Sequence, residues 1–260
     1  MMTKTPHSGR ALLLLCSLLA LLSIEATATE LKFCTESEDS YPWILKNRKG
    51  LSIILLEMVE KRISQKILID AIPWKRCLQE LKAGHYDGAV NASFKTDRAE
   101  FAVYPMTVDK VDISKRMLID SYSLYRLKGS KVEWDGKVFK PDDAIVGAQT
   151  GFSVVDQLKS LNLKVDDSSG STEINLKKLL LGRVTAVALP TLQGDNLLNK
   201  DTELQKKIEK IALPLIEKPY YLIFSKPFFA QEGTLVKKIW DSIELTRESA
   251  EYKKQMDLFK

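Results

Sequence analysis

The sequence predicts an α/β protein of two lobes, in which each lobe is a mainly parallel sheet flanked by helices and a double-crossed hinge joins the lobes. A βαβαβ alternation of hydrophobic patterns occupies residues 31–92 and recurs at residues 144–189. Strand-like stretches at 121–126 and 220–226 follow the first and second block. Because the second block is inserted between two such stretches, the chain is expected to cross between the lobes twice.

The first block contains three expected strands and two expected helices. Residues 31–36 alternate around Phe33, and apolar residues then repeat at helical spacing from Leu51 to Ile63. The next helix ends at Gly84, a residue suited to a left-handed C-cap. In chain order we expect a strand at 31–36, a helix at 51–63, a strand at 66–72, a helix at 75–83 and a strand at 86–92.

The second block repeats this order, and residues 179–188 align on residues 81–90 around Gly182 and Gly84. Here we expect strands at 144–149, 163–166 and 184–189, helices at 154–161 and 175–181, and amphipathic C-terminal helices around 235–245 and 250–259. The first lobe then comprises residues 29–122 and 222–260, and the second lobe comprises residues 123–221. The cleft between two such lobes is where a small ligand would bind.

The first 28 residues have the pattern of a secretory signal peptide. Lys4 and Arg10 supply positive charge, residues 11–24 are apolar, and Ala26-Thr27-Ala28 offers small residues for cleavage. An apolar run of about 14 residues falls short of the ~20 that span a bilayer, which argues against a membrane anchor. We therefore expect cleavage after residue 28 and a mature protein in an exported compartment.

The composition is that of an ordinary globular chain of 260 residues, with 45% apolar and 28% charged residues and a formal charge of +5. Beyond the signal peptide, His85 is the only histidine, and Cys34 and Cys77 are the only cysteines. This scarcity argues against a zinc site, a Cys-His mechanism or a Ser-His-Asp mechanism, so we expect no metal and no cofactor. Lysines interleaved with acids, as at 203–210, indicate a solvated surface rather than nucleic-acid binding.

The two remaining cysteines fall in neighbouring elements of the first lobe. Cys34 lies in the first expected strand, and Cys77 lies in the helix after Trp74. In an exported protein, a pair of cysteines favours a disulfide over two free thiols. We expect a structural disulfide between them, and we assign no role to His85, which follows a helix-ending glycine.

Arg98 is the first candidate for ligand binding. The segment from Ser93 to Glu100 is expected to begin a helix, with Thr96 or Asp97 as the N-cap and Glu100 as the partner of Asp97 in a capping box. A cation in the first helical turn opposes the helix dipole, so the position makes sense if Arg98 faces an anion that the helix amides also hold. The alternative is a solvated surface arginine.

Two aromatic segments follow the ends of expected strands. These are Pro73-Trp74-Lys75-Arg76 and Tyr41-Pro42-Trp43. The carboxyl ends of strands in open α/β sheets face the binding crevice, so an indole there can cover a ligand and Arg76 can contact an anion. The alternative for Trp74 is to pack the helix onto the sheet.

A third segment, from Gln149 to Ser153, joins the first strand of the second lobe to a helix. Gly151 lets the backbone approach a ligand, and Ser153 can cap the helix while neighbouring amides bind an anion. The alternative is an N-cap with no further role.

These segments occur in an order that resembles a known family. Asp87-Gly88, Thr96-Asp97-Arg98, Tyr104-Pro105 and the Gln-Thr-Gly turn follow the export signal and the first aromatic loop. The whole mature chain thereby resembles the bacterial extracellular solute-binding proteins of family 3, which are periplasmic receptors for polar amino acids in ABC importers. The stretch 73–105 is its most specific part, and Pro-Trp-Lys-Arg-Cys-Leu at 73–78 resembles one branch of the family.

The resemblance implies the type II periplasmic-binding-protein fold, whose two lobes close on a ligand. It also implies that Arg98 grips the α-carboxylate of the ligand, that Ser153 joins it from the other lobe, and that Trp43 and Trp74 stack on the ligand. The candidate ligand-binding residues are Glu36, Tyr41, Trp43, Trp74, Arg76, Ser93, Arg98, Gln149, Gly151, Ser153 and Thr191.

One departure from the family pattern concerns the ligand's amino group. Amino-acid binders usually place an Asp after the strand that follows Gly182-Arg183-Val184, but Pro190 occupies that position and Thr191 follows it. Either another acid such as Glu36 takes the ammonium group, or the ligand is a carboxylate without an α-amine.

The expected function is capture of a small carboxylate-bearing solute and its delivery to the membrane permease of an ABC transporter, by a monomer that binds no nucleic acid. One alternative is a dehydratase-like enzyme on the same fold, with Glu36 as general acid or base. Another is a sensory partner that presents its ligand-bound state to a membrane receptor.

Overall fold

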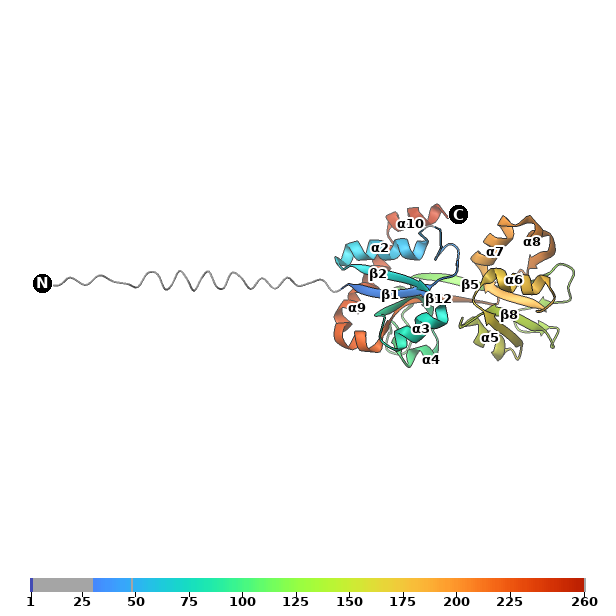
Figure 1. The fold of residues 1–260 in the computed structure, drawn as a ribbon, viewed down its shortest axis with the longest axis horizontal. Coiled ribbons are helices and arrows are strands. Elements are labelled where there is room, and N and C mark those ends of the chain that lie inside the picture. Colours follow the sequence, from blue (N-terminus) through green and yellow to red (C-terminus); the bar gives the residue numbers. More distant parts are fainter. Residues whose placement is uncertain (2–29, 48, 260) are drawn as a thin grey trace.

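The computed structural model describes residues 1, 30–47 and 49–259, which form two groups of helices and strands (Figure 1). Apart from Met1, the expected signal peptide at residues 1–28 lies outside the described residues. In the described part of the chain, no helix is both long enough and apolar enough to cross a membrane.

The first expected βαβαβ block is confirmed, with ends within two residues of the expected positions. The apolar repeat of the first helix buries Leu55 and Val59 completely. The elements are β1 (Leu31–Glu36), α2 (Leu51–Ile63), β2 (Ile67–Ile72), α3 (Trp74–Lys82) and β3 (Gly88–Ser93), followed by α4 (Thr96–Ala99), β4 (Ala102–Val103), the 3-10 helix η2 (Ile113–Lys115) and β5 (Leu118–Leu127).

The second block is confirmed with ends within three residues, and several further elements surround it. It contains β8 (Ile145–Gln149), α5 (Val154–Ser160), β9 (Lys164–Ser169), α6 (Thr172–Leu180) and β10 (Ala186–Pro190). The others are β6 (Glu133–Trp134), β7 (Phe139–Lys140), α7 (Thr191–Lys200), α8 (Thr202–Lys207), β11 (Ile208–Lys210), β12 (Ile216–Ser225), α9 (Lys226–Arg247) and α10 (Ala250–Asp257).

The second connecting strand, β12, begins four residues earlier than the sequence predicts and contains Pro219. Proline cannot donate a ladder hydrogen bond and is tolerated where a strand has a free edge. Pro219 pairs with Ile119 of β5, whereas the pairing of β12 with β3 starts only at Tyr220. The proline therefore lies where β12 has a single neighbouring strand.

The strands form a sheet in the order β2-β1-β3-β12-β5-β10-β8-β9. Pairing is parallel at both ends of this order, where β1 joins β2 and β3, and β8 joins β9 and β10. The two central strands are antiparallel to their neighbours. The first half of β5 pairs with β12 and its second half with β10, so β5 runs from one group of elements into the other.

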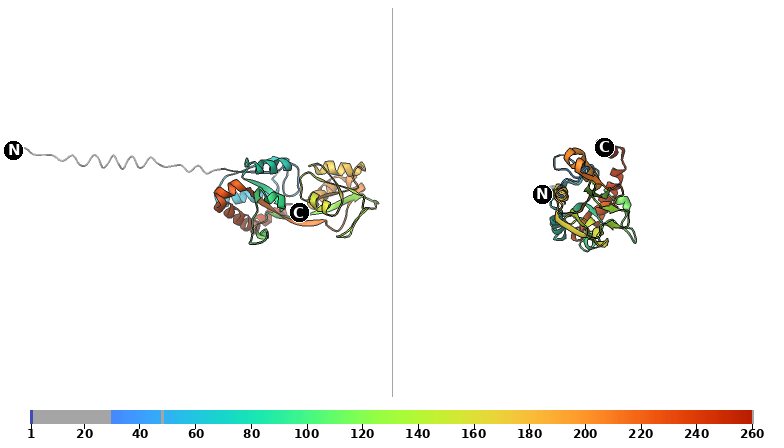
Figure 2. Two further views of the ribbon diagram at one scale, coloured as in Figure 1. Left: turned by 90° about the horizontal axis from the view of Figure 1, so that it is seen from below. Right: turned by 90° about the vertical axis from the view of Figure 1, so that its right-hand side faces the viewer.

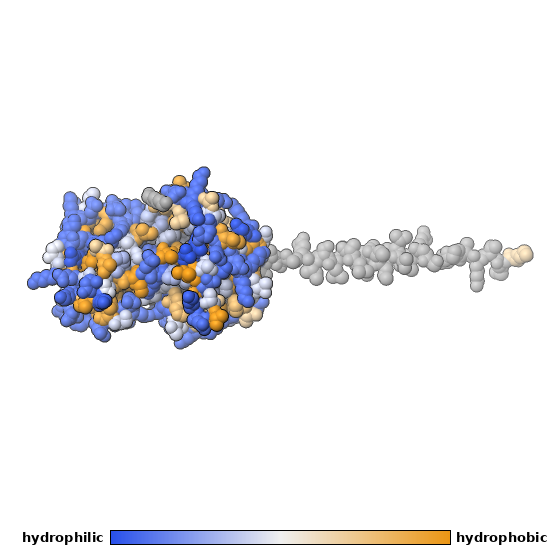
Figure 3. All heavy atoms as spheres, turned by 180° about the vertical axis from the view of Figure 1, so that it is seen from behind, coloured by the Kyte–Doolittle hydropathy of each residue, from blue (hydrophilic) through white to orange (hydrophobic). Residues whose placement is uncertain are grey.

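Each group of elements has its own hydrophobic interior. Phe33, Leu222 and Trp240 belong to the interior of the first group, whereas Leu124 and Val146 belong to that of the second. Figure 2 shows the groups side by side, with strands running between them along one side. On the face seen in Figure 3, apolar side chains occur in small groups between polar and charged ones.

Candidate functional site

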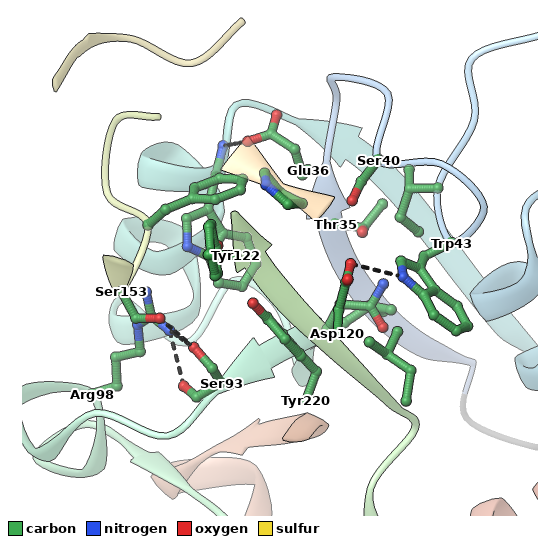
Figure 4. A pocket seen from close by; sticks show the side chains of 17 residues that line it. Thr35, Glu36, Ser40, Trp43, Ser93, Arg98, Asp120, Tyr122, Ser153 and Tyr220 are labelled. Atoms are coloured by element: carbon green, nitrogen blue, oxygen red, sulfur yellow. Dashed lines mark hydrogen bonds between the residues drawn. The ribbon is translucent and has the colours of Figure 1, made fainter. Parts of the chain in front are cut away.

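A cavity of about 50 Å³ lies between the two groups of elements, beside the central strands β5 and β12 (Figure 4). The carboxyl ends of β1, β3 and β10 converge on it, as expected for an α/β sheet. Six predicted site residues line it, namely Glu36, Trp43, Trp74, Ser93, Arg98 and Ser153. The other lining residues are Thr35, Ser40, Ile44, Val90, Asn91, Leu118, Asp120, Tyr122, Phe152, Pro190 and Tyr220.

The guanidinium of Arg98, which is only 3% exposed, forms one end of the cavity. Its Nη1 donates to the carbonyl of Ser93 at 2.9 Å, and its Nη2 donates to the carbonyl of Gly151 at 2.9 Å. The Trp74 ring centroid lies 5.5 Å from the Cζ atom of Arg98. In the described chain, this guanidinium donates its hydrogen bonds to neutral oxygens, so its charge remains available to an anion.

The capping box expected at Arg98 is wrong. Helix α4 has only four residues, and Lys95 precedes it without a side-chain capping bond. The carboxylate of Asp97 lies 3.2 Å from Lys95 Nζ instead, and Glu100 already occupies the C-cap position. Arg98 does lie in the first turn as predicted, but what holds it is the Trp74 ring and the two carbonyls.

Ser93 and Ser153 meet across the cavity, with their hydroxyl oxygens 2.8 Å apart. Ser153 precedes α5 at the N-cap as predicted, but its hydroxyl makes no capping bond. It accepts instead from Lys218 Nζ at 3.1 Å. Burial lowers the pKa of Lys218, and the charge of Arg98 lowers it further. Two cations therefore make this end of the cavity positive.

Asp120 lies on the other side of the cavity from Arg98 (Figure 4) and is 7% exposed. Its Oδ2 accepts from Trp43 Nε1 at 3.0 Å, and its Oδ1 accepts from the backbone N–H of Ser121 at 2.8 Å. Burial raises the pKa of this carboxyl to about 7, although both hydrogen bonds oppose the shift. The indole that the sequence places against the ligand is thus fixed by a buried acid.

Asp120 is not among the predicted site residues, although the sequence carries a signal for it. Along β5, Leu118, Asp120 and Tyr122 share one face, and all three are buried. An acid between two apolar residues at this spacing is an inward-facing acid. Such a residue is costly unless it has a function or a partner.

Glu36, the acid that the sequence does single out, is buried and lines the cavity. Its Oε1 accepts from the backbone N–H groups of Ser37 and Glu38, and its Oε2 accepts from that of Trp74 at 3.2 Å. Burial raises the pKa of Glu36 and these hydrogen bonds lower it. The carboxylate therefore holds together the end of β1 and the start of α3.

Five predicted site residues do not line the cavity. The hydroxyl of Tyr41 donates to a carbonyl near the C-terminus, and the side chain of Arg76, 66% exposed, lies beside a glutamate of its own helix. The amide of Gln149 donates to a loop carbonyl, and the hydroxyl of Thr191 contacts two serines of β5. Gly151, with a φ of +76°, contributes its carbonyl to the guanidinium described above.

The expected disulfide between Cys34 and Cys77 is present and joins β1 to α3, with Cα atoms 5.6 Å apart. It anchors the helix that carries Trp74 to the strand that ends in Glu36. The imidazole of His85 is exposed and lies 2.6 Å from a glutamate carboxylate. Within residues 30–47 and 49–259, no group of His, Cys, Asp and Glu side chains is arranged to hold a metal ion.

No protein-family model matches the sequence, and no curated protein matches it either. Solved structures do match. The arginine-, lysine- and histidine-binding protein ArtJ from Geobacillus stearothermophilus is 17% identical, with 89% of this chain and 95% of ArtJ covered and a TM-score of 0.69. An arginine transport-system periplasmic binding protein from Legionella pneumophila is 15% identical, covering 89% and 99%, with a TM-score of 0.70.

A third match is a histidine kinase sensor domain with similarity to periplasmic binding proteins. It is 12% identical, covers 88% of this chain and 95% of the sensor domain, and has a TM-score of 0.71. At these identities the likeness concerns the fold. The chain has the type II periplasmic-binding-protein fold, as the resemblance implies.

Proposed function

We propose that the chain is a periplasmic solute-binding protein of family 3, which captures a small carboxylate-bearing solute between its lobes and delivers it to the permease of an ABC importer. The observation that carries this proposal is Arg98, a buried guanidinium at a cavity whose hydrogen-bond partners are neutral oxygens. A carboxylate would complete it, because a guanidinium fork matches two carboxylate oxygens.

The division into lobes belongs to this proposal. Residues 29–122 and 222–260 form one lobe, residues 123–221 form the other, and β5 and β12 are the hinge. The contacts that join the lobes near the cavity include Arg98 to the carbonyl of Gly151, Ser93 to Ser153, and Lys95 Nζ to the carboxylate of Asp156 at 2.6 Å. Because a ligand at Arg98 touches residues of both lobes, it would favour the closed form.

The binding function is favoured over the enzyme alternative by the state of Glu36. General acid–base catalysis needs a carboxyl group within reach of the ligand. The oxygens of Glu36 accept hydrogen bonds from three backbone N–H groups, which is a structural role. The sensory alternative differs from import only in the membrane partner, and similarity to a sensor domain concerns the fold. We propose that the protein takes part in solute import. We also propose that it is exported through a cleaved signal peptide and acts as a monomer.

A ligand screen tests the proposal. The purified protein, unfolded and refolded to remove bound solute, is screened by thermal shift against amino acids, small mono- and dicarboxylates and amines, since a ligand of the folded state raises the melting temperature. Hits are measured by calorimetry in Arg98→Ala and in Arg76→Ala, an exposed arginine on a neighbouring helix.

Arg98→Ala should weaken binding about 10- to 100-fold or more, which is the worth of a lost charge-assisted bidentate contact. Arg76→Ala should bind like the unmodified protein. Arg98→Lys keeps the charge but not the fork and should fall between the two. Equal affinity in Arg98→Ala, or hits confined to solutes without a carboxylate, would contradict the proposal.

A further inference from the structure

We propose that Asp120 of the hinge strand β5 is the residue that recognises the ammonium group of a ligand whose carboxylate lies on Arg98. This inference rests on the proposed function, because it concerns the same cavity. It assigns the positive end of the cavity to the ligand's carboxylate and the Asp120 side to its ammonium group.

The first argument is the spare acceptor capacity of Asp120. An ionised carboxylate has about four acceptor positions. The hydrogen bonds of Asp120 use two of them, for the indole N–H of Trp43 and the backbone N–H of Ser121. In the described chain the hydrogen bonds to Asp120 come from neutral groups, and none of the ion pairs involves it. A buried carboxylate without a cation is costly, and a ligand ammonium would supply the missing charge.

The second argument is an unpartnered hydroxyl in the same cavity wall. Thr35 is 2% exposed, lines the cavity, and its Oγ1 has no hydrogen-bond partner among the described atoms. Figure 4 shows Thr35 and Ser40 on the same side of the cavity as Asp120, and Arg98 on the other side. An ammonium group has three donors, and the carboxylate and the two hydroxyls are acceptors suited to it.

Opposite charges face each other across the cavity. Tyr122 and Tyr220 line it together with Arg98 and Asp120, which lie on different sides of it (Figure 4). A ligand with a carboxylate and an amine would satisfy both ends at once, whereas a simple acid would leave Asp120 buried without a cation.

Asp120 also lies near the place where the resemblance to family 3 implies an acid. Pro190 occupies that position and lines the cavity. Pro190 pairs with Tyr122 on the adjacent strand, and Asp120 lies two residues before Tyr122. An acid is thus present near that place, on β5 rather than after β10.

The size of the cavity limits the ligand. A volume of about 50 Å³ leaves room for a small solute only. The probes that fit best are therefore small amino acids with few heavy atoms. Larger amino acids would require the lobes to stand further apart.

The test uses pairs of probes that differ only in the amine: glycine and acetate, L-alanine and propionate, and 4-aminobutyrate and butyrate. Each probe is titrated calorimetrically into the refolded protein and into Asp120→Asn, Thr35→Val and Asp109→Asn. Asp109 is an exposed residue away from the cavity and serves as the matched control. Circular dichroism and thermal melts establish that each variant is folded.

We expect the unmodified protein to bind the amino member of at least one pair about 10-fold tighter or more, the range of a hydrogen bond to a charged group. Asp120→Asn should reduce this preference to within a few-fold, Thr35→Val should reduce it partly, and Asp109→Asn should retain it. If Asp120→Asn does not fold, calorimetry of the unmodified protein near pH 7 decides the matter: an ammonium group at Asp120 would release a proton on binding, and binding without proton release would overturn the assignment.

The two proposals fail in different ways. Binding of the acids with affinity equal to that of their amino partners overturns this inference and leaves the receptor function standing. An amine preference that survives in Asp120→Asn overturns it as well. If no probe binds, neither in these pairs nor in the wider screen, the receptor function falls and this inference falls with it.

Discussion

The titration of the buried Asp120 side chain predicts how the stability of the protein depends on pH. Burial raises the pKa of this carboxyl from 3.8 to about 7 in the folded protein. Between these pH values the folded chain holds a proton that the unfolded chain has lost, so the free energy of unfolding falls as pH rises. The cost of burying Asp120 is absent below about pH 4 and complete above about pH 7.

The magnitude follows from the size of the shift. A difference of about 3 pKa units corresponds to about 4 kcal/mol of lost stability across that window. Asp120→Asn removes the titration. It also leaves either Trp43 or Ser121 without an acceptor, because an amide has one acceptor oxygen and both carboxylate oxygens are used. That second loss, about 1–3 kcal/mol, does not depend on pH.

Urea unfolding followed by tryptophan fluorescence, from pH 4 to pH 8.5 and without ligand, measures both proteins. The quantity of interest is the free energy of unfolding of the unmodified protein minus that of Asp120→Asn. It should decrease by up to about 4 kcal/mol from the acid to the alkaline end. Glu36, whose pKa burial also raises, is common to both proteins and cancels. A difference that stays constant to within about 1 kcal/mol across this pH range would refute the reasoning.

Three further predictions follow from the same structure. Replacing Cys34 and Cys77 with alanine removes a disulfide that joins residues at a sequence separation of 43. The free energy of unfolding, measured by urea titration, should fall by about 4 kcal/mol. An unchanged urea midpoint would contradict this prediction. Gly50→Ala puts a Cβ 2.2 Å from the carbonyl oxygen of Trp43. It should therefore lower the free energy of unfolding by at least about 1–3 kcal/mol and weaken ligand binding. An unchanged free energy of unfolding together with an unchanged ligand affinity would contradict this prediction. Binding of an amino acid should lower the pKa of Asp120 and release up to one proton near pH 7. Calorimetry would show this release as a binding heat that depends on the buffer. Binding of an acid without an amine should release no proton.

Much of the fold follows from local patterns in the sequence. The apolar repeat of α2 and the helix-ending glycines at 84 and 182 lie in the described structure where the pattern places them, with φ of +78° and +66° at these glycines. Helix α7 is not predicted, because its segment starts after Pro190 and contains Gly194, a poor helix former. The structure requires glycine there, since a Cβ at that position would lie 2.4 Å from the Tyr125 ring.

The cation of the site, Arg98, could be predicted from the sequence, whereas its acid, Asp120, could not. Arg98 stands out because a cation at a helix start needs an explanation, and in the structure the Trp74 ring and two carbonyls hold it. Asp120 is a single acid in an alternating strand. Its importance depends on which face of β5 meets the cavity, and that is set by the pairing of β5 with strands far away in the sequence.

A crystal structure of the protein with its tightest-binding solute tests the central claim most directly. The account predicts that the solute lies between the lobes, with its carboxylate on the guanidinium of Arg98 and its ammonium group within hydrogen-bond distance of Asp120. A solute bound outside this cavity would contradict the proposed function. A solute bound on Arg98 without any cationic group near Asp120 would contradict the assignment of that residue.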